Sequence, residues 1–284
     1  MTPDGATGDA DAMKNSVNIT MIGYGEVGST FAREFLARGD VRVTAYDLKF
    51  DSPDHGPAML ERARQAGVAT AANHVAAASG ADIVISAVTA DVALAVAEQA
   101  ATYLKKDQIF FDINSASPGA KTKAAKAVNA AGARYVEGAV MAPVPGPGIR
   151  VPILAGGPAA ARAAEILNAL GMNVTPVTTI PGRASATKLC RSIMIKGIEA
   201  LIVDCARASK EWDVQKEVFA SLEASFPGID FSKLARDMAQ RVNQHGVRRA
   251  AEMREAALML DDLGMDGSLS RAVADAQQRG AGKA

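Results

Sequence analysis

Short apolar runs separated by helical patterns fill the first two thirds of the chain. Such runs are typical of strands in a parallel sheet that is covered on both faces. They occur at residues 17–22, 41–46, 81–88, 108–112 and 134–140, and two later strands are predicted at 151–157 and 173–177. Helical patterns lie between most of these runs. The alternation predicts an α/β fold with a doubly wound parallel sheet.

The strand patterns stop at Gly182, and helical periodicity continues from there. Residues 185–212 predict one long helix, because no proline or capping residue interrupts them. Shorter helices are predicted at 216–225, 231–243, 247–263 and 268–279, with Gly264 and Gly280 as C-terminal caps. The second part of the chain is therefore predicted to be all-α.

The chain has 284 residues, which suits two domains rather than one. Residues 1–15 are small, polar and acidic and lack the apolar core of a secretory signal, so they predict a disordered extension. We expect a nucleotide-binding α/β domain at 16–181 and a helical domain for substrate binding and dimerisation at 182–284.

Composition and charge exclude several kinds of partner. The formal net charge is +0, so no broad basic field is expected to attract nucleic acid or an anionic membrane. No apolar stretch reaches the roughly 18 residues of a membrane span. Cys190 and Cys205 fall on the same predicted helix, about 22 Å apart, too far for a disulfide. The three histidines are scattered, so no metal site is expected, and a reducing, cytoplasmic setting follows.

A glycine-rich turn directly follows the first strand and precedes a helical pattern. Its residues are Gly23, Tyr24, Gly25, Glu26, Val27 and Gly28. In such a turn, the first glycine permits the sharp bend, the second lets a pyrophosphate approach the backbone, and the third lets helix pack on strand. The order strand, glycine turn, helix is the dinucleotide-binding Rossmann fingerprint, so we expect these six residues to bind the cofactor.

An acidic residue, Asp47, ends the second predicted strand, 19 residues beyond Gly28. This is near the usual spacing of a carboxylate that binds the ribose hydroxyls and repels a 2′-phosphate. The alternative is that Asp47 only forms the turn before Leu48. We favour ribose binding, and therefore NAD, although the neighbouring Lys49 leaves NADP possible.

Other candidate residues follow later strands, where ligands bind in parallel sheets. Val88 and Thr89 follow the third strand, and Asn114 and Ser115 follow the fourth. We expect Val88, Thr89 and Asn114 to contact the cofactor. Ser115 either contacts the substrate or belongs to the cap of the helix after Pro118, and both roles can coexist.

Four segments together resemble the β-hydroxyacid dehydrogenase superfamily, which includes 3-hydroxyisobutyrate and 6-phosphogluconate dehydrogenases. They are the glycine turn; Asp112 to Pro118, similar to a D-x-S-T-x-x-P segment; Tyr135 to Met141, at the place of a substrate loop; and Gly182 to Leu189, similar to the segment with a catalytic lysine. The late residues 188–192 and 245–253 resemble a branch with a phosphogluconate-dehydrogenase-like C-terminal domain. The resemblance implies hydride transfer to or from NAD(P).

The resemblance assigns the general acid/base to Lys188. At i+3 and i+4 on the predicted helix, Arg191 and Ser192 share its face. Arg191 is expected to lower the pKa of Lys188 or to grip an anionic substrate group, and Ser192 to bind the substrate hydroxyl or Lys188 itself. Two departures stand out: Ser192 replaces an asparagine, and Met141-Ala142-Pro143 replaces a Ser-Gly-Gly. These changes leave the identity of the substrate open. Met141 remains a candidate substrate contact.

Other polar residues of the chain, and the apolar faces of the long helix, also have interpretations. Lys196 is expected to be structural or at the rim of the site. His245, Arg248, Arg249 and Glu252 form either a solvated helix face, favoured for Arg249, or a grip on a substrate anion. Glu137, on the last strand of the parallel series, is read as supporting structure. Apolar residues on several sides of the long helix predict a homodimer.

We therefore expect an NAD(P)-dependent dehydrogenase that acts on the CH–OH group of a small, anionic molecule, with Lys188, Ser115 and Ser192 as catalytic residues. Two alternatives remain open. The scaffold could reduce imines or keto acids, because residues near the lysine and in the substrate loop have changed. It could also be a sensor that binds NAD(H) without catalysis.

Overall fold

The computed structural model describes residues 16–282, which form two compact units, one ending at Ser185 and the other beginning at Ala186. The predicted extension at 1–15 lies outside the described residues. The long elements expected from the hydrophobic pattern are present with small differences at the ends, except that two predicted helices are one.

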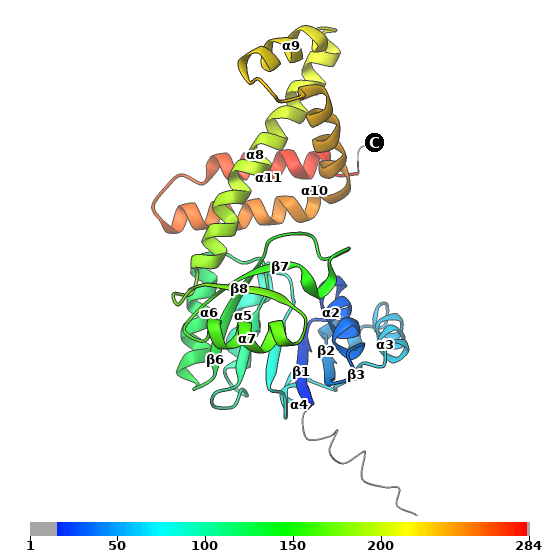
Figure 1. Ribbon diagram of the computed structural model, residues 1–284, viewed down its shortest axis with the longest axis vertical. Helices are drawn as coiled ribbons and strands as arrows, with labels where there is room; N and C mark the ends of the chain where they lie inside the picture. The colour runs from blue at the N-terminus through cyan, green and yellow to red at the C-terminus, as the bar shows by residue number, and fades with distance from the viewer. Residues whose placement is uncertain (1–15, 283–284) are drawn as a thin grey trace, which may run out of the picture. The chain divides into compact units, whose positions relative to one another are not determined.

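One eight-stranded sheet forms the centre of the first unit. Its strands are β1 (Val17–Ile22), β2 (Val41–Tyr46), β3 (Ala69–Thr70), β4 (Ile83–Ser86), β5 (Ile109–Asp112), β6 (Arg134–Val140), β7 (Pro152–Gly156) and β8 (Asn173–Thr178). They lie in the order β3-β2-β1-β4-β5-β6-β7-β8 (Figure 1). The first six strands have the order of a dinucleotide-binding sheet.

The sheet is mostly parallel, which confirms the predicted fold class. The exception is β7, which runs antiparallel to β6, whereas β8 is again parallel to β7. The short strand β3 had no counterpart among the predicted strands, because two exposed residues carry no periodic signal. Ser86 pairs with Asp112 and Asp112 with Glu137, so the carboxyl ends of β4 and β5 lie side by side, and β5 also adjoins β6.

Helices cover both faces of the sheet. They are α2 (Glu26–Leu36), α3 (Gly56–Gln65), α4 (His74–Ala78), α5 (Ala90–Ala100), α6 (Pro118–Ala130) and α7 (Ala160–Ala169), with 3₁₀ turns η1 (Leu48–Asp51) and η2 (Gly148–Arg150). Phe111 of β5 packs in one core cluster with Phe31 of α2 and Leu167 of α7. Its neighbour Phe110 belongs to the other, with Ala97 of α5 and Val128 of α6. This alternation is the reason why strand positions are apolar on both faces.

The second unit is all-α, as expected. After Ala186 it contains the rest of α8 (Arg183–Glu211), then α9 (Gln215–Ser225), α10 (Phe231–Asp262) and α11 (Ser268–Gly280). One core joins Leu189 of α8 with Met253 of α10 and Ala274 of α11. A second core lies where Val203 of α8 meets Met238 and Val242 of α10. Within the described part of the chain, no helix is both long and apolar enough to span a bilayer.

The prediction of separate helices at 231–243 and 247–263 is wrong, because α10 continues through both. Figure 1 shows that α10 changes direction along its length without ending. Gly246 lies between the two predicted helices and is a contact position: a Cβ there would overlap the Gln277 carbonyl and approach Ala281. Glycine is needed for the close approach of α11, not for a turn.

The two predicted glycine caps behave differently. Gly264 has φ of +71° and follows the end of α10, as a C′ glycine does. Gly280 is still part of α11, and a Cβ there would overlap the Val242 side chain. The contact between α10 and α11 therefore includes two glycines, Gly246 on α10 and Gly280 on α11.

We predict that Gly246→Ala lowers the free energy of unfolding by about 1–3 kcal/mol, because the added methyl group pushes α10 and α11 apart. Gly197→Ala in α8 is the matched control, since a Cβ there meets nothing within 4 Å. It should be neutral or stabilising, by up to about 1 kcal/mol. Urea titration followed by circular dichroism measures both. Equal effects of the two substitutions would contradict this account of Gly246.

Candidate functional site

The three glycines of the turn after β1 have different surroundings. Gly23 has φ of +97°, and a Cβ there would overlap the Ala87 carbonyl. A Cβ on Gly28, in the first turn of α2, would overlap the Gly23 carbonyl. A Cβ on Gly25 would meet nothing within 4 Å. Two glycines therefore allow strand, turn and helix to pack together, and the third leaves open space where a ligand can reach the backbone.

The N-terminus of α2 lies at this open position. Gly25 is its N-cap, and no side chain caps the amides of the first turn. Uncapped amides and the helix dipole suit a phosphate group. The open cradle at Gly25 and these amides fit the pyrophosphate of a dinucleotide, so the backbone from Gly23 to Gly28 is placed as a cofactor site requires.

Tyr24 contributes its backbone to this turn, but its side chain is buried in the core. The ring packs on Phe50, with 5.8 Å between ring centroids, and the Arg62 guanidinium lies 5.2 Å from its centroid. Burial raises the pKa of the Tyr24 hydroxyl, although Arg62 and Arg33 lower it in part. Arg62 also donates to the Tyr24 carbonyl at 2.6 Å. Arg62 could not be identified from a local pattern, because its contact with Tyr24 crosses 38 positions of the chain.

Asp47 lies beside the glycine turn at the end of β2. Its Oδ2 accepts from the Tyr24 amide at 2.7 Å, and its Oδ1 accepts from the Lys49 amide at 2.9 Å. The turn-forming role is therefore present. An ionised carboxylate has about four acceptor positions, so these two bonds leave acceptor capacity for ribose hydroxyls.

Asn114 ties the carboxyl ends of β4 and β5 together. Its Oδ1 accepts from the Val88 amide at 2.6 Å, and its Nδ2 donates to Ser86 Oγ and to Asp112 Oδ1. The amide group thus has protein partners at both ends and is buried. Asn114 fixes the backbone at Val88, and any effect of its side chain on a cofactor passes through this positioning.

A buried ion pair lies beneath the same edge. Lys121 Nζ is 2.7 Å from Asp112 Oδ1, and neither side chain is exposed. The Tyr135 hydroxyl donates to Asp112 Oδ2 at 2.8 Å. Burial and the Asp112 charge raise the pKa of Tyr135 well above its usual value, so the hydroxyl stays protonated. This network fixes the end of β5, from which the segment with Asn114 and Ser115 continues.

The remaining candidates of the first unit lie at the same edge. Thr89 is the N-cap of α5. Ser115 is half-buried after β5, and Met141 follows β6, with its amide bonded to the Pro152 carbonyl. Glu137 is fully buried within β6, where it accepts from the Ser185 hydroxyl at 2.7 Å and from the Ala184 amide at 3.0 Å. It is a supporting residue, because it caps the first turn of α8.

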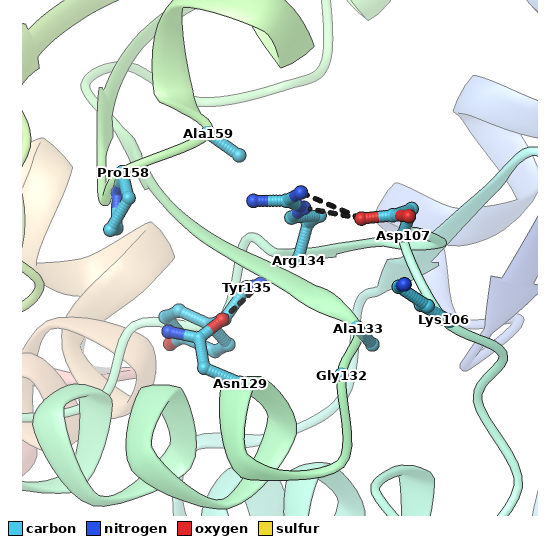
Figure 2. A pocket seen from close by; sticks show the side chains of 9 residues that line it. All are labelled: Lys106, Asp107, Asn129, Gly132, Ala133, Arg134, Tyr135, Pro158 and Ala159. Carbon is cyan, nitrogen blue, oxygen red and sulfur yellow. Dashed lines mark hydrogen bonds and ion pairs between the residues drawn. The ribbon is translucent and has the colours of Figure 1, made fainter.

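A hollow of about 380 Å³ lies at the opposite, amino-terminal end of β5 and β6. Figure 2 shows Arg134 reaching across it to Asp107, with which it forms an exposed ion pair. Asn129 faces Tyr135 and accepts from its amide. Because ligands of such sheets bind at the carboxyl ends of strands, this hollow is not the candidate site.

The second unit contains a buried group of charged side chains. Glu252 of α10 lies between two lysines of α8, with its Oε1 3.1 Å from Lys188 Nζ and its Oε2 2.6 Å from Lys196 Nζ. The exposed fractions of these side chains are 12% for Lys188, 7% for Lys196 and 9% for Glu252. Lys196 also donates to Ser192 Oγ at 3.0 Å. Lys188, Ser192 and Lys196 are one helical turn apart, which places them along one face.

Burial and charge act in opposite directions on these groups. Burial alone would raise the pKa of Glu252, but Lys188 and Lys196 together outweigh it and bring the value to about 2. Glu252 is therefore a carboxylate at neutral pH. Burial lowers the pKa of Lys196, and the adjacent Glu252 carboxylate offsets this only in part.

Another buried ion pair of the second unit lies next to the group formed by Glu252, Lys188 and Lys196. Arg249 of α10 is paired with the fully buried Glu199 of α8, and Arg241 lies 3.7 Å from the same carboxylate. Gln277 of α11 donates to the Lys196 carbonyl at 3.2 Å. Arg249 Nε and Gln277 Oε1 are buried without a hydrogen-bond partner. Three helices thus share one polar interior.

The expectations for this region are corrected in part. Lys196 is not at a rim, because it is buried and shares Glu252 with Lys188, and this position agrees with the structural reading. Arg249 and Glu252 do not form a solvated face, since both are paired and largely buried. His245, Arg248 and Arg191 are exposed. A signal was available: polar residues at 188, 192, 196 and 199 form a stripe along an otherwise apolar helix.

Within residues 16–282, no group of three or more His, Cys, Asp or Glu side chains is arranged to hold a metal ion. The two cysteines are not bonded to each other.

Comparison with known families separates the two parts of the chain. Residues 18–179 match the family described as the NAD binding domain of 6-phosphogluconate dehydrogenase. Residues 210–280 match a domain of unknown function. The first match covers more than half of the chain and includes every candidate cofactor residue.

Three solved structures resemble the whole chain. A conserved hypothetical protein from Sinorhizobium meliloti is 38% identical, with 96% of this chain and 91% of that chain covered and a TM-score of 0.80. A conserved protein of unknown function, described as similar to 3-hydroxyacid dehydrogenases, is 30% identical, with 93% and 98% covered and a TM-score of 0.74. The Mycobacterium tuberculosis 3-hydroxyisobutyrate dehydrogenase is 15% identical, with 93% of each chain covered and a TM-score of 0.73, a likeness of fold alone.

We predict that Gly25→Ala weakens NADH binding by about tenfold or more, or about 1.4 kcal/mol, while the melting temperature stays unchanged. The added methyl group would occupy the open cradle without touching the protein. Gly28→Ala is the contrasting variant, because its methyl group would meet the Gly23 backbone; it should lose about 1–3 kcal/mol of stability. NADH fluorescence titration and thermal melts measure the two effects. Unchanged NADH affinity in a folded Gly25→Ala protein would contradict the cradle.

Proposed function

Since the chain belongs to the family defined by the NAD binding domain of 6-phosphogluconate dehydrogenase, we propose that it is an NAD(P)-dependent oxidoreductase that acts on CH–OH groups. Lys188 is the general acid/base in this proposal. The observation that supports it best is that the Lys188 ammonium is largely buried and lies 3.1 Å from Glu252, which it shares with a second lysine. An ordinary surface lysine would extend into solvent.

The cofactor in this proposal is held by the first unit. Backbone amides from Gly23 to Gly28 bind the pyrophosphate, and Asp47 accepts from the ribose hydroxyls. Val88 and Thr89, at the end of β4, contact the nicotinamide half. A carboxylate at the ribose position favours NAD over NADP, because it repels a 2′-phosphate. When bound, the cofactor supplies the hydride acceptor for oxidation or the hydride donor for reduction.

The protein residues handle the proton. In oxidation, the substrate O–H and C–H bonds break as the C=O bond forms; the hydride leaves with its electron pair, and neutral Lys188 takes the hydroxyl proton on Nζ. In reduction, the Lys188 ammonium returns that proton to the oxygen. Positioned acid/base groups of this kind contribute roughly 10²–10⁴-fold to rates.

The substrate class follows from charge. Lys188, Lys196 and Arg249 are three largely buried cations, whereas Glu199 and Glu252 are two buried anions. The excess positive charge favours an anionic substrate. Ser115 and Met141 in the first unit are the proposed substrate contacts there. In the second unit, Ser192, Arg191, His245 and Arg248 are further candidates, of which the last three are exposed.

We predict that Lys188→Met lowers kcat by about 100-fold or more, because the proton acceptor is lost, while NADH affinity is unchanged. A panel of small hydroxyacids and sugar acids, assayed in both directions with NAD and NADP, supplies the substrate. Lys210→Met, at the exposed end of α8, is the matched control and should keep wild-type turnover. Wild-type turnover in Lys188→Met would end the assignment. Reduction of imines without any alcohol oxidation would favour the alternative that the protein is an imine reductase.

A homodimer is part of the proposal. Along α8, Met194, Ile198 and Leu201 are exposed at the spacing i, i+4, i+7, and the exposed fraction of Leu201 is 73%. These residues form one apolar stripe on a helix whose other face contacts α10 and α11. A second copy of the chain would cover such a stripe in a dimer.

We predict that Leu201→Lys shifts the protein from dimer to monomer at micromolar concentration, because the charge would be buried in the interface. Val75→Lys, at another exposed apolar residue, is the control and should leave the dimer intact. Light scattering coupled to size-exclusion chromatography measures the mass. A wild-type monomer, or a Leu201→Lys dimer, would contradict this assignment.

A further inference from the structure

The two lysines beside Glu252 are not equivalent. Lys196 is the more tightly held, with its Nζ 2.6 Å from Glu252 Oε2 and 3.0 Å from Ser192 Oγ. The Lys188 nitrogen is 3.1 Å from the other carboxylate oxygen and is somewhat more exposed. The shorter contact is therefore with Lys196, but the carboxylate acts on the charges of both lysines.

One carboxylate cannot fully neutralise two ammonium groups. If Lys196 were absent, Glu252 would form a simple ion pair with Lys188 and would stabilise its charged form. With Lys196 present, the same carboxylate is shared, and Lys188 also lies near a second positive charge. A shared partner therefore makes it easier for Lys188 to release a proton, while the ion pair still fixes the position of its nitrogen.

We propose that Glu252 and Lys196 are positioning residues for Lys188: the Glu252 carboxylate holds the Lys188 nitrogen in place, and the Lys196 ammonium shares its negative charge. Lys188 is thereby left able to release and recover a proton. This inference rests on the proposed function, in which Lys188 exchanges a proton with the substrate. Neither Glu252 nor Lys196 touches the reacting atoms in this scheme.

Other charged groups of the second unit lie near this triad. Glu199 lies on α8, one turn beyond Lys196. It is paired with Arg249 of α10, and Arg241 of the same helix lies near its carboxylate. Helix α11 contributes Gln277, which carries no charge. Substitution at 196 or 252 therefore changes the field at Lys188 directly, while the Glu199–Arg249 pair stays in place.

The test is a pH titration of Lys188 by NMR, using lysine labelled at Cε and Nζ, with the signal assigned by its loss in Lys188→Arg. Lys196→Met should move the Lys188 midpoint to higher pH, because the Glu252 carboxylate is then no longer shared with Lys196. Glu252→Gln should move it to lower pH, because two ammonium groups then face each other. Each shift is expected to be about one pH unit, a tenfold change in proton affinity.

Two control variants separate charge from packing. Lys196→Arg keeps the positive charge and should leave the midpoint within about 0.3 pH unit of wild type. Lys210→Met removes an exposed cation from the same helix and should leave it unchanged. If Glu252→Gln does not fold, as judged by circular dichroism, the Lys196→Met and Lys196→Arg pair decides the question. The proposal would be overturned if Lys196→Met and Glu252→Gln shifted the Lys188 midpoint in the same direction or did not shift it. Deprotonation of Lys196 before Lys188 would also overturn it.

Turnover gives a second, independent readout. The midpoint of the pH profile of kcat/KM for oxidation should follow the NMR midpoint in each variant. If Lys188→Met keeps full turnover while the NMR midpoints shift as expected, the proposed function fails and the positioning holds. If Lys188→Met is inactive but the midpoints do not move, the positioning fails and the proposed function stands.

Discussion

The helical unit depends on one carboxylate between two ammonium groups. Removing one partner of a buried ion pair costs about 3–5 kcal/mol, because an uncompensated charge remains inside the protein. Glu252 therefore fixes α8 to α10 as firmly as the apolar contacts of Leu189 and Met253 do. The arrangement is costly for stability alone, since an apolar core of the same volume would serve as well. This is why we connect it with chemistry: burial readily shifts the pKa of a lysine, so that its charge can be switched.

The nucleotide-binding unit reaches its geometry by backbone contacts instead. Gly23 and Gly28 are required by the protein itself, because side chains there would overlap neighbouring carbonyls, whereas Gly25 is open. Asp47 and Asn114 then fix the surroundings, the first by accepting from the Tyr24 amide and the second by accepting from the Val88 amide. The buried Asp112–Lys121 pair supports the same edge from below. The proposed cofactor site is thus mainly a rigid edge of backbone.

Much of this could be predicted from the sequence, because it is local. The strands are short apolar runs and the glycine turn is contiguous, so the fold and the position of the cofactor edge follow from neighbouring residues. The direction of β7 could not be predicted, since periodicity is the same in parallel and antiparallel strands. Gly246 was misread because a helix-contact glycine and a helix-breaking glycine look alike in one sequence. Lys196 and Glu252 were undervalued for a related reason: their contact joins helices far apart in the chain, and only the polar stripe along α8 hinted at it.

The most direct test of the account is a crystal structure of the protein with NAD and an unreactive analogue of a small hydroxyacid substrate. The account predicts that Lys188 Nζ lies about 3 Å from the analogue oxygen that corresponds to the reacting hydroxyl, with the adjacent carbon facing the nicotinamide ring. It also predicts that Glu252 still contacts both lysines. A structure in which Lys188 lies beyond about 3.5 Å of that oxygen, with no bridging water, would contradict it.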